Sequence, residues 1–276
     1  PLRQLGLQET DIVAIARPLA KRAWMVQKPG DCVPAFVEAF DLAVSGRPGP
    51  VLLDIPIDVQ KSEVTEKRKP VKVNLARPEK GIKEFAGRFL KVLASARRPL
   101  ILAGGGVRAS GSSGMLAAFL ENSGVPLVYS LLGTDVIPSR HPARIGMIGS
   151  YGNRFANIAV KEADLLLVLG SRMDIRQTGT DVGAFRENKQ IFHIDIDRAE
   201  LNNRIKPCDG CCGDLKVFLS FLTGRSARLP ELNIQPWRQR LSDLISLYPD
   251  TMEQPSSASI INPNMFITKL SRASSR

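Results

Sequence analysis

The sequence predicts an α/β fold in which helices cover both faces of a doubly wound parallel sheet. Apolar runs at residues 165–169 and 191–196 are short and continuous, which is typical of strands buried on both faces. Strand-like and helix-like segments alternate from Gly81 onward, as successive βαβ units do. Polar loops follow the apolar runs, and open α/β sheets bind ligands at the carboxyl ends of their strands.

The first sixty residues predict part of a separate α/β domain. Helices are expected near residues 10–20 and 32–44, followed by a strand over residues 50–55. The second helix has a candidate N-cap at Asp31 and an apolar face formed by Pro34, Phe36, Val37, Phe40 and Ala43. Residues 61–80 are charged, contain two prolines and carry little apolar material, which predicts an interdomain linker.

Residues 81–225 predict a complete central domain with about six strands, because strand and helix patterns alternate there without interruption. The expected elements are a helix from Ile82 to Leu93, a strand over 99–103, a helix over 112–123, a strand over 125–129, a helix over 153–163, strands over 164–169 and 191–196, and a helix capped by Asp214 that runs through Leu222. Residues 226–260 are expected to form a second linker. Residues 261–276 are expected to begin a further α/β domain.

Composition argues against several classes of protein. No apolar run is long enough to cross a bilayer, so no membrane partner is expected. The net charge of +11 would suit nucleic acid, but Lys and Arg are spread along the chain and aromatic residues make up only 6%. Four cysteines are too few for a secreted disulfide framework, which favours the cytoplasm. The sequence starts at Pro1 without Met, and we expect it to be a piece of a longer protein.

Cysteine and histidine residues offer few candidates for chemistry. Cys208, Cys211 and Cys212 form a C-x-x-C-C pattern that zinc or iron can use, but no second cluster completes a tetrahedral site. We therefore expect a cysteine-containing loop and predict no metal site. His141 and His193 stand alone in the sequence and are expected to be structural.

Glycine-rich turns mark the ends of several predicted elements. Gly104, Gly105 and Gly106 separate a strand from a helix, where bare N–H groups can approach a phosphate. A tight turn required only by packing explains these residues equally well. Similar turns recur at 146–152, 170–172 and 213–214, so one edge of the sheet would suit an extended nucleotide. The charged loop after residue 169 predicts either an anion site or a local salt bridge.

Six segments, in the same order and at matching spacing, resemble the acetolactate synthase large subunit family of thiamine-diphosphate enzymes. They are GLQETDIV (6–13), GRPGPVLLDIPIDVQ (46–60), GMIGSYGN (146–153), GSRMDIRQTG (170–179), HIDID (193–197) and GD (213–214). The resemblance covers nearly the whole chain. It implies that residues 1–60 end a pyrimidine-binding domain, that 81–225 are the central domain, and that 261–276 begin a pyrophosphate-binding domain.

The resemblance implies that catalytic groups lie outside these residues. In this family the first and third domains hold thiamine diphosphate with Mg²⁺. The activating glutamate would precede Pro1 and the metal-binding motif would follow Arg276. The 276 residues alone are therefore expected to be inactive, with Gln8, next to Glu9, as a candidate neighbour of the active site.

The resemblance also implies a structural FAD site in the central domain. Arg47, Arg172 and Arg176 can offer forked donors to a diphosphate or to flavin carbonyls, and Asp195 can accept from ribose hydroxyls. The full set of candidate cofactor contacts is Arg47, Gly104, Gly105, Gly106, Ser130, Leu131, Met147, Ile148, Gly149, Gly170, Ser171, Arg172, Met173, Asp174, Arg176, Asp195, Ile196, Asp214 and Leu215.

For the parent protein the resemblance implies decarboxylation of pyruvate or another 2-oxo acid and carbon–carbon bond formation with a carbonyl acceptor, as in branched-chain amino acid biosynthesis. It implies a homodimer or homotetramer and admits a regulatory subunit. Ile57, Ile148 and Ile175 depart from the family pattern. Ile57 and Ile148 would add apolar wall and favour a neutral aldehyde over a second pyruvate. Two alternatives remain: a related carboligase with another acceptor, and a non-catalytic adenine-dinucleotide-binding module.

Overall fold

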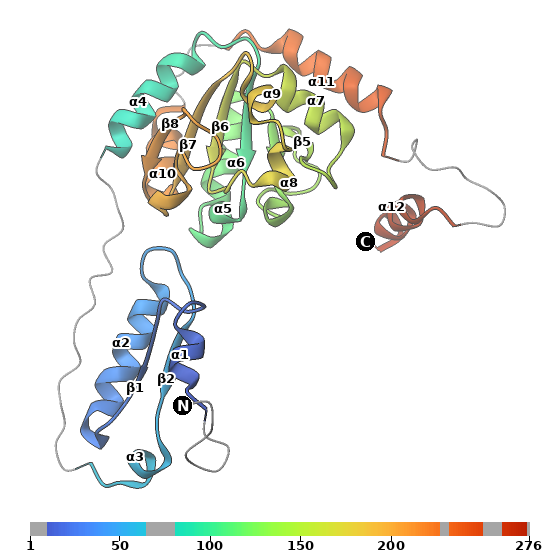
Figure 1. Ribbon diagram of the computed structural model, residues 1–276. Coiled ribbons are helices and arrows are strands. Elements are labelled where there is room, and N and C mark those ends of the chain that lie inside the picture. The colour runs from blue at the N-terminus through green and yellow to red at the C-terminus, as the bar shows by residue number, and fades with distance from the viewer. Residues whose placement is uncertain (1–9, 65–80, 227–231, 251–260, 275–276) are drawn as a thin grey trace. The chain divides into compact units, whose positions relative to one another are not determined.

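The computed structural model describes residues 10–64, 81–226, 232–250 and 261–274 (Figure 1). The chain divides into two compact units, Pro1–Pro78 and Glu79–Arg276. Among the described residues, no helix combines the length and the apolar character needed to span a membrane.

The N-terminal unit contains a two-stranded parallel sheet. Strands β1 (Arg22–Met25) and β2 (Val51–Asp54) pair in register, with Ala23 opposite Leu52. Its other elements are α1 (Ile12–Ala16), η1 (Pro29–Asp31), α2 (Cys32–Val44) and α3 (Ile57–Lys61). Helix α2 and strand β2 agree with the sequence prediction, whereas the first helix is shorter than expected and β1 was not predicted.

Helix α2 turns out to bury little of its predicted apolar face. Ala35 is buried, but Phe36 and Phe40 remain 59% and 69% exposed. Asp31 occupies the N-cap position without a side-chain capping hydrogen bond. The other end of α2 is held by Lys21, whose ammonium group donates to the carbonyls of Leu42 and Ser45 at 2.5 and 2.7 Å. These contacts satisfy carbonyls that a helix end leaves without intrahelical partners.

The C-terminal unit contains a six-stranded sheet in the order β5-β4-β3-β6-β7-β8, and every pairing is parallel. The strands are β3 (Pro99–Ala103), β4 (Leu127–Tyr129), β5 (Arg144–Met147), β6 (Leu165–Leu169), β7 (Gln190–Asp195) and β8 (Asp209–Cys212). From β3 the chain first adds strands on one side and then, from β6, on the other. The predicted doubly wound parallel sheet is confirmed, with its switch point between β3 and β6.

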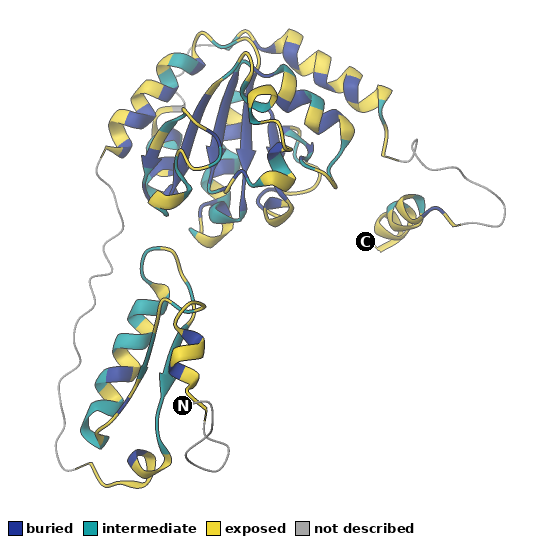
Figure 2. Cartoon of the chain, viewed as in Figure 1, coloured by how far each residue is buried: buried dark blue, intermediate teal, exposed yellow. Residues whose placement is uncertain are grey.

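Helices cover both faces of this sheet, and its four central strands, β3, β4, β6 and β7, are almost entirely buried (Figure 2). Side chains alternate along β6, so that Leu165, Leu167 and Leu169 face one core while Leu166 and Val168 face the other. The first core lies against α4 (Ile82–Leu93), α6 (Ser113–Ser123) and α10 (Leu215–Ser226). The second lies against α7 (Arg154–Glu162) and α11 (Gln235–Leu247).

An aromatic cluster joins α4 and α10 to the sheet. The ring of Phe85 lies 5.5 Å from the rings of both Phe192 and Phe218, and Phe89 lies 5.6 Å from Phe192. Edge-to-face and tilted contacts of this kind add stability beyond the area that they bury. The helix predicted from Ile82 to Leu93 is confirmed at both ends.

Helix α11 corrects the prediction that residues 226–260 form a linker. Trp237, Leu241 and Leu244 are buried in the second core, and the Trp237 indole N–H donates to the carbonyl of Pro99 at 3.0 Å. Part of the expected linker is therefore an integral layer of the C-terminal unit. Beyond it, α12 (Pro263–Ser274) is the last described element.

The cysteine-containing segment is a strand, not a loop. Cys211 and Cys212 lie in edge strand β8, which Arg88 of α4 anchors by two hydrogen bonds to Asp209, at 2.7 and 2.9 Å. All four cysteines are free thiols. Among the described residues, no group of three or more His, Cys, Asp or Glu side chains is arranged to hold a metal ion.

Candidate functional site

The glycine turns after β3 and β6 meet at the switch point of the sheet. The Gly104 N–H donates to the Leu169 carbonyl at 2.9 Å, and the Gly106 N–H donates to the Gly170 carbonyl at 3.1 Å. A Cβ atom on Gly104 would lie 2.2 Å from the Gly170 oxygen. Close packing of the two turns therefore accounts for Gly104 and Gly106, and both N–H groups are already committed to the protein.

A third turn, after β4, joins the same edge. It contains Ser130, which is buried, and the short helix η2 (Leu131–Gly133). The Ser130 N–H donates to the Ala103 carbonyl at 3.0 Å, and a Cβ on Gly133 would lie 2.3 Å from that same oxygen. Gly105, in α5 (Gly105–Ala109), faces Leu132, whose Cβ would be 3.1 Å from an added methyl. The turns after β3 and β4 thus pack backbone against backbone.

The turn after β5 attaches to the loop that follows β6. Gly149 has a φ of +99°, and a Cβ there would lie 2.4 Å from the Arg176 carbonyl oxygen. That oxygen accepts from the Ser150 N–H at 2.8 Å. The side chain of Asn157 accepts from the Gly149 N–H at 2.8 Å and donates to the Gly149 carbonyl at 3.0 Å. Four turns therefore form one continuous carboxyl edge.

Asp174 has a structural role in the β6 loop. Its Oδ1 accepts from the N–H groups of Arg176 and Gln177 at 3.0 and 3.2 Å, so it caps the short helix α8 (Ile175–Thr178). The preceding residue, Met173, is buried and has a φ of +51°. A non-glycine residue in this left-handed region stores strain of a kind that clusters at functional sites.

The two arginines of this loop differ in their surroundings. Arg172 Nε lies 3.0 Å from Glu200 Oε1, and its side chain is 63% exposed. The side chain of Arg176 is exposed at the same edge. A phosphate could thus recruit Arg176 directly, whereas Arg172 would share its guanidinium with Glu200.

Acidic residues lie at the ends of the neighbouring elements. Asp195 ends β7, is 8% exposed, and its Oδ1 accepts from the Asp197 N–H at 2.9 Å. Asp214 is almost fully buried, and its Oδ1 accepts from the Lys216 N–H at 2.7 Å at the start of α10. Asp195 is therefore placed at the edge where a ribose would lie in a dinucleotide fold, while Asp214 serves the helix.

Several predicted contacts face inward. Ile148 and Met173 lie in the second core, and Leu215 lies in the first, where its Cδ1 would be 2.8 Å from a Cβ on Gly170. Their side chains are in the protein core, so Ile148 adds no apolar wall to a binding surface, contrary to the expectation from its sequence. Ser171 is also buried, while Met147 and Ile196 are half-buried.

Two predicted residues belong to the N-terminal unit of the chain. Arg47 is exposed in the N-terminal unit, in the turn between α2 and β2. Gln8 lies outside the described residues.

Some exposed apolar side chains at this edge were missed from the sequence. Leu131 was among the candidates and Ile175, which is 52% exposed, was noted as a departure from the family pattern, but Leu132 and Tyr151, which are 68% and 80% exposed, were not singled out. Large apolar residues are unusual in the turns that follow strands. Their presence in these turns is the sequence signal that could have identified them. Together with the arginines, they suit a ligand that has both a charged part and a flat apolar part.

Behind the β6 loop, the side chain of His193 on β7 is fully buried. Neither imidazole nitrogen has a hydrogen-bond partner among the described residues. Burial lowers the pKa of His193 to about 4, and the nearby backbone of Ser171 opposes this only in part. The ring is therefore neutral in the folded protein near neutral pH.

Comparison with known proteins matches residues 87–222 to the family described as "Thiamine pyrophosphate enzyme, central domain". A probable acetolactate synthase large subunit of Methanocaldococcus jannaschii is 33% identical over 278 residues, covering 98% of this chain and 46% of the relative. Acetolactate synthase 1 of Zea mays is 39% identical, covering 79% and 35%. The Lactococcus lactis large subunit is 39% identical, covering 79% and 38%. The chain thus spans less than half the length of these relatives.

Proposed function

The chain belongs to the thiamine pyrophosphate enzymes of acetolactate synthase type, and from this premise we propose that its C-terminal unit holds a dinucleotide, FAD, in a structural role. The observation that carries the proposal is the convergence of four turns at the switch point of the sheet. Arg172 and Arg176 supply cationic groups there, and Leu131, Leu132 and Tyr151 supply exposed apolar surface. The residues present therefore fit a ligand with a diphosphate and a flat ring system.

For the complete protein we propose thiamine-diphosphate-dependent decarboxylation of a 2-oxo acid, followed by carbon–carbon bond formation with a carbonyl acceptor. The names of the relatives support this reaction class. Thiamine diphosphate, held with Mg²⁺, would supply the electron sink for this chemistry when bound. The described residues contribute positioning: they hold the dinucleotide edge rigid. A cytoplasmic homo-oligomer, with or without a regulatory subunit, is part of the same proposal.

Binding measurements on the 276-residue chain test the ligand. FAD, ADP and inorganic pyrophosphate would be titrated separately by calorimetry. FAD is expected to bind most tightly, because it alone reaches both the arginines and the apolar surface. Equal affinity for ADP would favour an adenine-nucleotide module without a flavin, and no binding of any of the three would overturn the proposal.

Replacing Arg172 or Arg176 with alanine is expected to weaken FAD binding by about 1.5–3 kcal/mol, the range for a charged hydrogen bond. The melting temperature should change little, because both side chains are exposed. Lysine should not restore a bidentate contact. Arg225→Ala, at the far end of α10, is the matched control and should bind FAD normally. Wild-type affinity in both Ala variants would refute the assignment of these arginines.

We also propose that the 276 residues form no acetolactate by themselves. The relatives that carry the acetolactate synthase name are more than twice as long as the part that aligns with this chain. The purified chain would be supplied with pyruvate, thiamine diphosphate, Mg²⁺ and FAD, and acetolactate would be assayed. Measurable product would contradict the proposal.

A further inference from the structure

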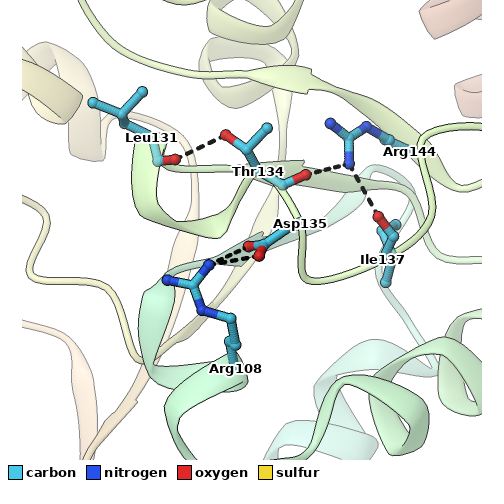
Figure 3. Close-up of polar contacts among 6 residues, drawn as sticks. All are labelled: Arg108, Leu131, Thr134, Asp135, Ile137 and Arg144. Carbon is cyan, nitrogen blue, oxygen red and sulfur yellow. Dashed lines mark hydrogen bonds and ion pairs between the residues drawn. The ribbon is translucent and has the colours of Figure 1, made fainter. Parts of the chain in front are cut away.

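The turn after β4 is fastened to the glycine turn by an ion pair (Figure 3). Arg108 lies in the last turn of α5, the helix that begins at Gly105. Its Nη1 donates to both carboxylate oxygens of Asp135, at 2.7 and 2.6 Å. Asp135 follows η2 in the chain by two residues, so this pair joins the loops after two adjacent strands.

A second arginine holds the same turn from the opposite side. Arg144 of β5 donates from Nη1 to the carbonyls of Thr134 and Ile137, at 2.6 and 3.1 Å (Figure 3). Its guanidinium also lies 4.0 Å from the centre of the Tyr129 ring. The hydroxyl of Thr134 donates to the Leu131 carbonyl at 2.8 Å. The backbone from residue 131 to 137 is therefore held at both ends.

The side chains that this turn presents are apolar and exposed. Leu131 and Leu132 are 66% and 68% exposed, beside the glycine turn at the switch point. Holding leucine side chains in water does not stabilise the fold. It does reduce the conformational entropy that the protein loses when a ligand binds, and this favours binding. In a binding site, the residues that contact the ligand are kept in position in this way by the residues behind them.

We propose that Arg108 and Asp135 are positioning residues, which fix the β4 turn so that Leu131 and Leu132 form a preformed apolar surface for the flat ring of the bound nucleotide. This inference rests on the proposed function. Arg108 and Asp135 are 56% and 58% exposed, and exposed ion pairs contribute little to stability. Their effect should therefore appear in ligand binding and in local backbone protection, not in the global stability of the unit.

The test is a double-mutant cycle in the full chain. Arg108→Gln, Asp135→Asn, the double variant and the charge-swapped variant (Arg108→Asp with Asp135→Arg) would be compared with wild type. Each single variant is expected to weaken FAD binding roughly twofold to fivefold, the range of an exposed pair. The double variant should be no weaker than either single one, and the charge swap should restore part of the affinity. Melting temperatures should stay close to wild type.

Hydrogen exchange supplies a readout that does not depend on a ligand. In the ligand-free chain, the amide of Gly133, which donates to the Ser130 carbonyl at 2.8 Å, should exchange faster in both single variants. The control is the Arg240–Glu162 pair, which is 47% and 30% exposed and joins α11 to α7. Arg240→Gln should leave both FAD binding and exchange in residues 130–137 unchanged.

The outcomes separate the inference from the proposed function. If wild type binds FAD and the single variants bind it equally well, the inference is overturned and the proposed function stands. Unchanged exchange at Gly133 also overturns the inference, whether or not FAD binds. If wild type binds no nucleotide, the proposed function fails and the positioning role fails with it.

Discussion

Gly104→Ala is expected to lower the free energy of unfolding of the C-terminal unit by about 1–3 kcal/mol, and to weaken nucleotide binding with it. The added Cβ would lie 2.2 Å from the Gly170 oxygen and 2.7 Å from the Ser171 Cα. Both contacts are with backbone, so relief requires the turns after β3 and β6 to move apart. Gly104 itself has an extended backbone, with a φ of −104°, so the effect comes from the collision and not from a conformational preference.

Gly87→Ala is the matched control. Gly87 lies within α4, is exposed, and has no atom within 4 Å of its Cβ position. Alanine there should raise the free energy of unfolding by up to about 1 kcal/mol, since glycine weakens a helix interior. Urea denaturation of both variants measures the two effects. A shift of the same sign in both would mean that the close approach of the two turns is not what requires Gly104.

Acidification is expected to destabilise the C-terminal unit through His193. The pKa of His193 is about 4 in the folded protein and about 6.5 when the chain is unfolded, so between these values the unfolded state binds more protons. Stability from this residue is complete above pH 6.5 and is lost as the pH falls toward 4. The total loss is about 3 kcal/mol.

His193→Leu should remove this pH dependence and, at pH 7, should cost little or stabilise the unit. The substitution replaces a buried ring whose nitrogens have no partners among the described residues. Urea denaturation of both proteins at pH values from 4 to 7 measures how the free energy of unfolding depends on pH. NMR titration of the imidazole, with His141 as the second signal, checks the protonation directly. A slope that persists in His193→Leu would assign the pH dependence to other groups.

Strands with two buried faces were predictable from sequence, whereas edge strands were not. β3 and β6 are continuous apolar runs, and both were predicted. β5 and β8 border the sheet, keep partly exposed side chains, and each contains one charged residue and one glycine among its four residues. Segments this short and without a continuous apolar run have no hydrophobic pattern that distinguishes a strand from a loop. Helix α11 did carry a signal, because Trp237, Leu241 and Leu244 recur at helical spacing.

The meeting of the glycine turns at one edge of the sheet was predictable, but the roles of individual residues were not. Gly104 and Gly106 were recognised as special, and geometry favours packing over direct phosphate contact. Ile148 was expected at a binding surface, but its side chain is buried in the second core. Tyr151, in the same turn, points into solvent. Sequence alone cannot show which residues of a tight turn are buried in the core and which are exposed to solvent.

The two tryptophans divide between the two units, and this makes each unit separately visible to fluorescence. Trp237 is buried in the C-terminal unit with its indole N–H bonded to the Pro99 carbonyl. Trp24 lies in β1 of the N-terminal unit, half-buried, with the Arg22 guanidinium 4.4 Å from its ring. In a Trp24→Phe chain, the remaining emission would report only the layer formed by α11 and β3. The red shift of this emission would then time the unfolding of the C-terminal unit without a signal from the N-terminal unit.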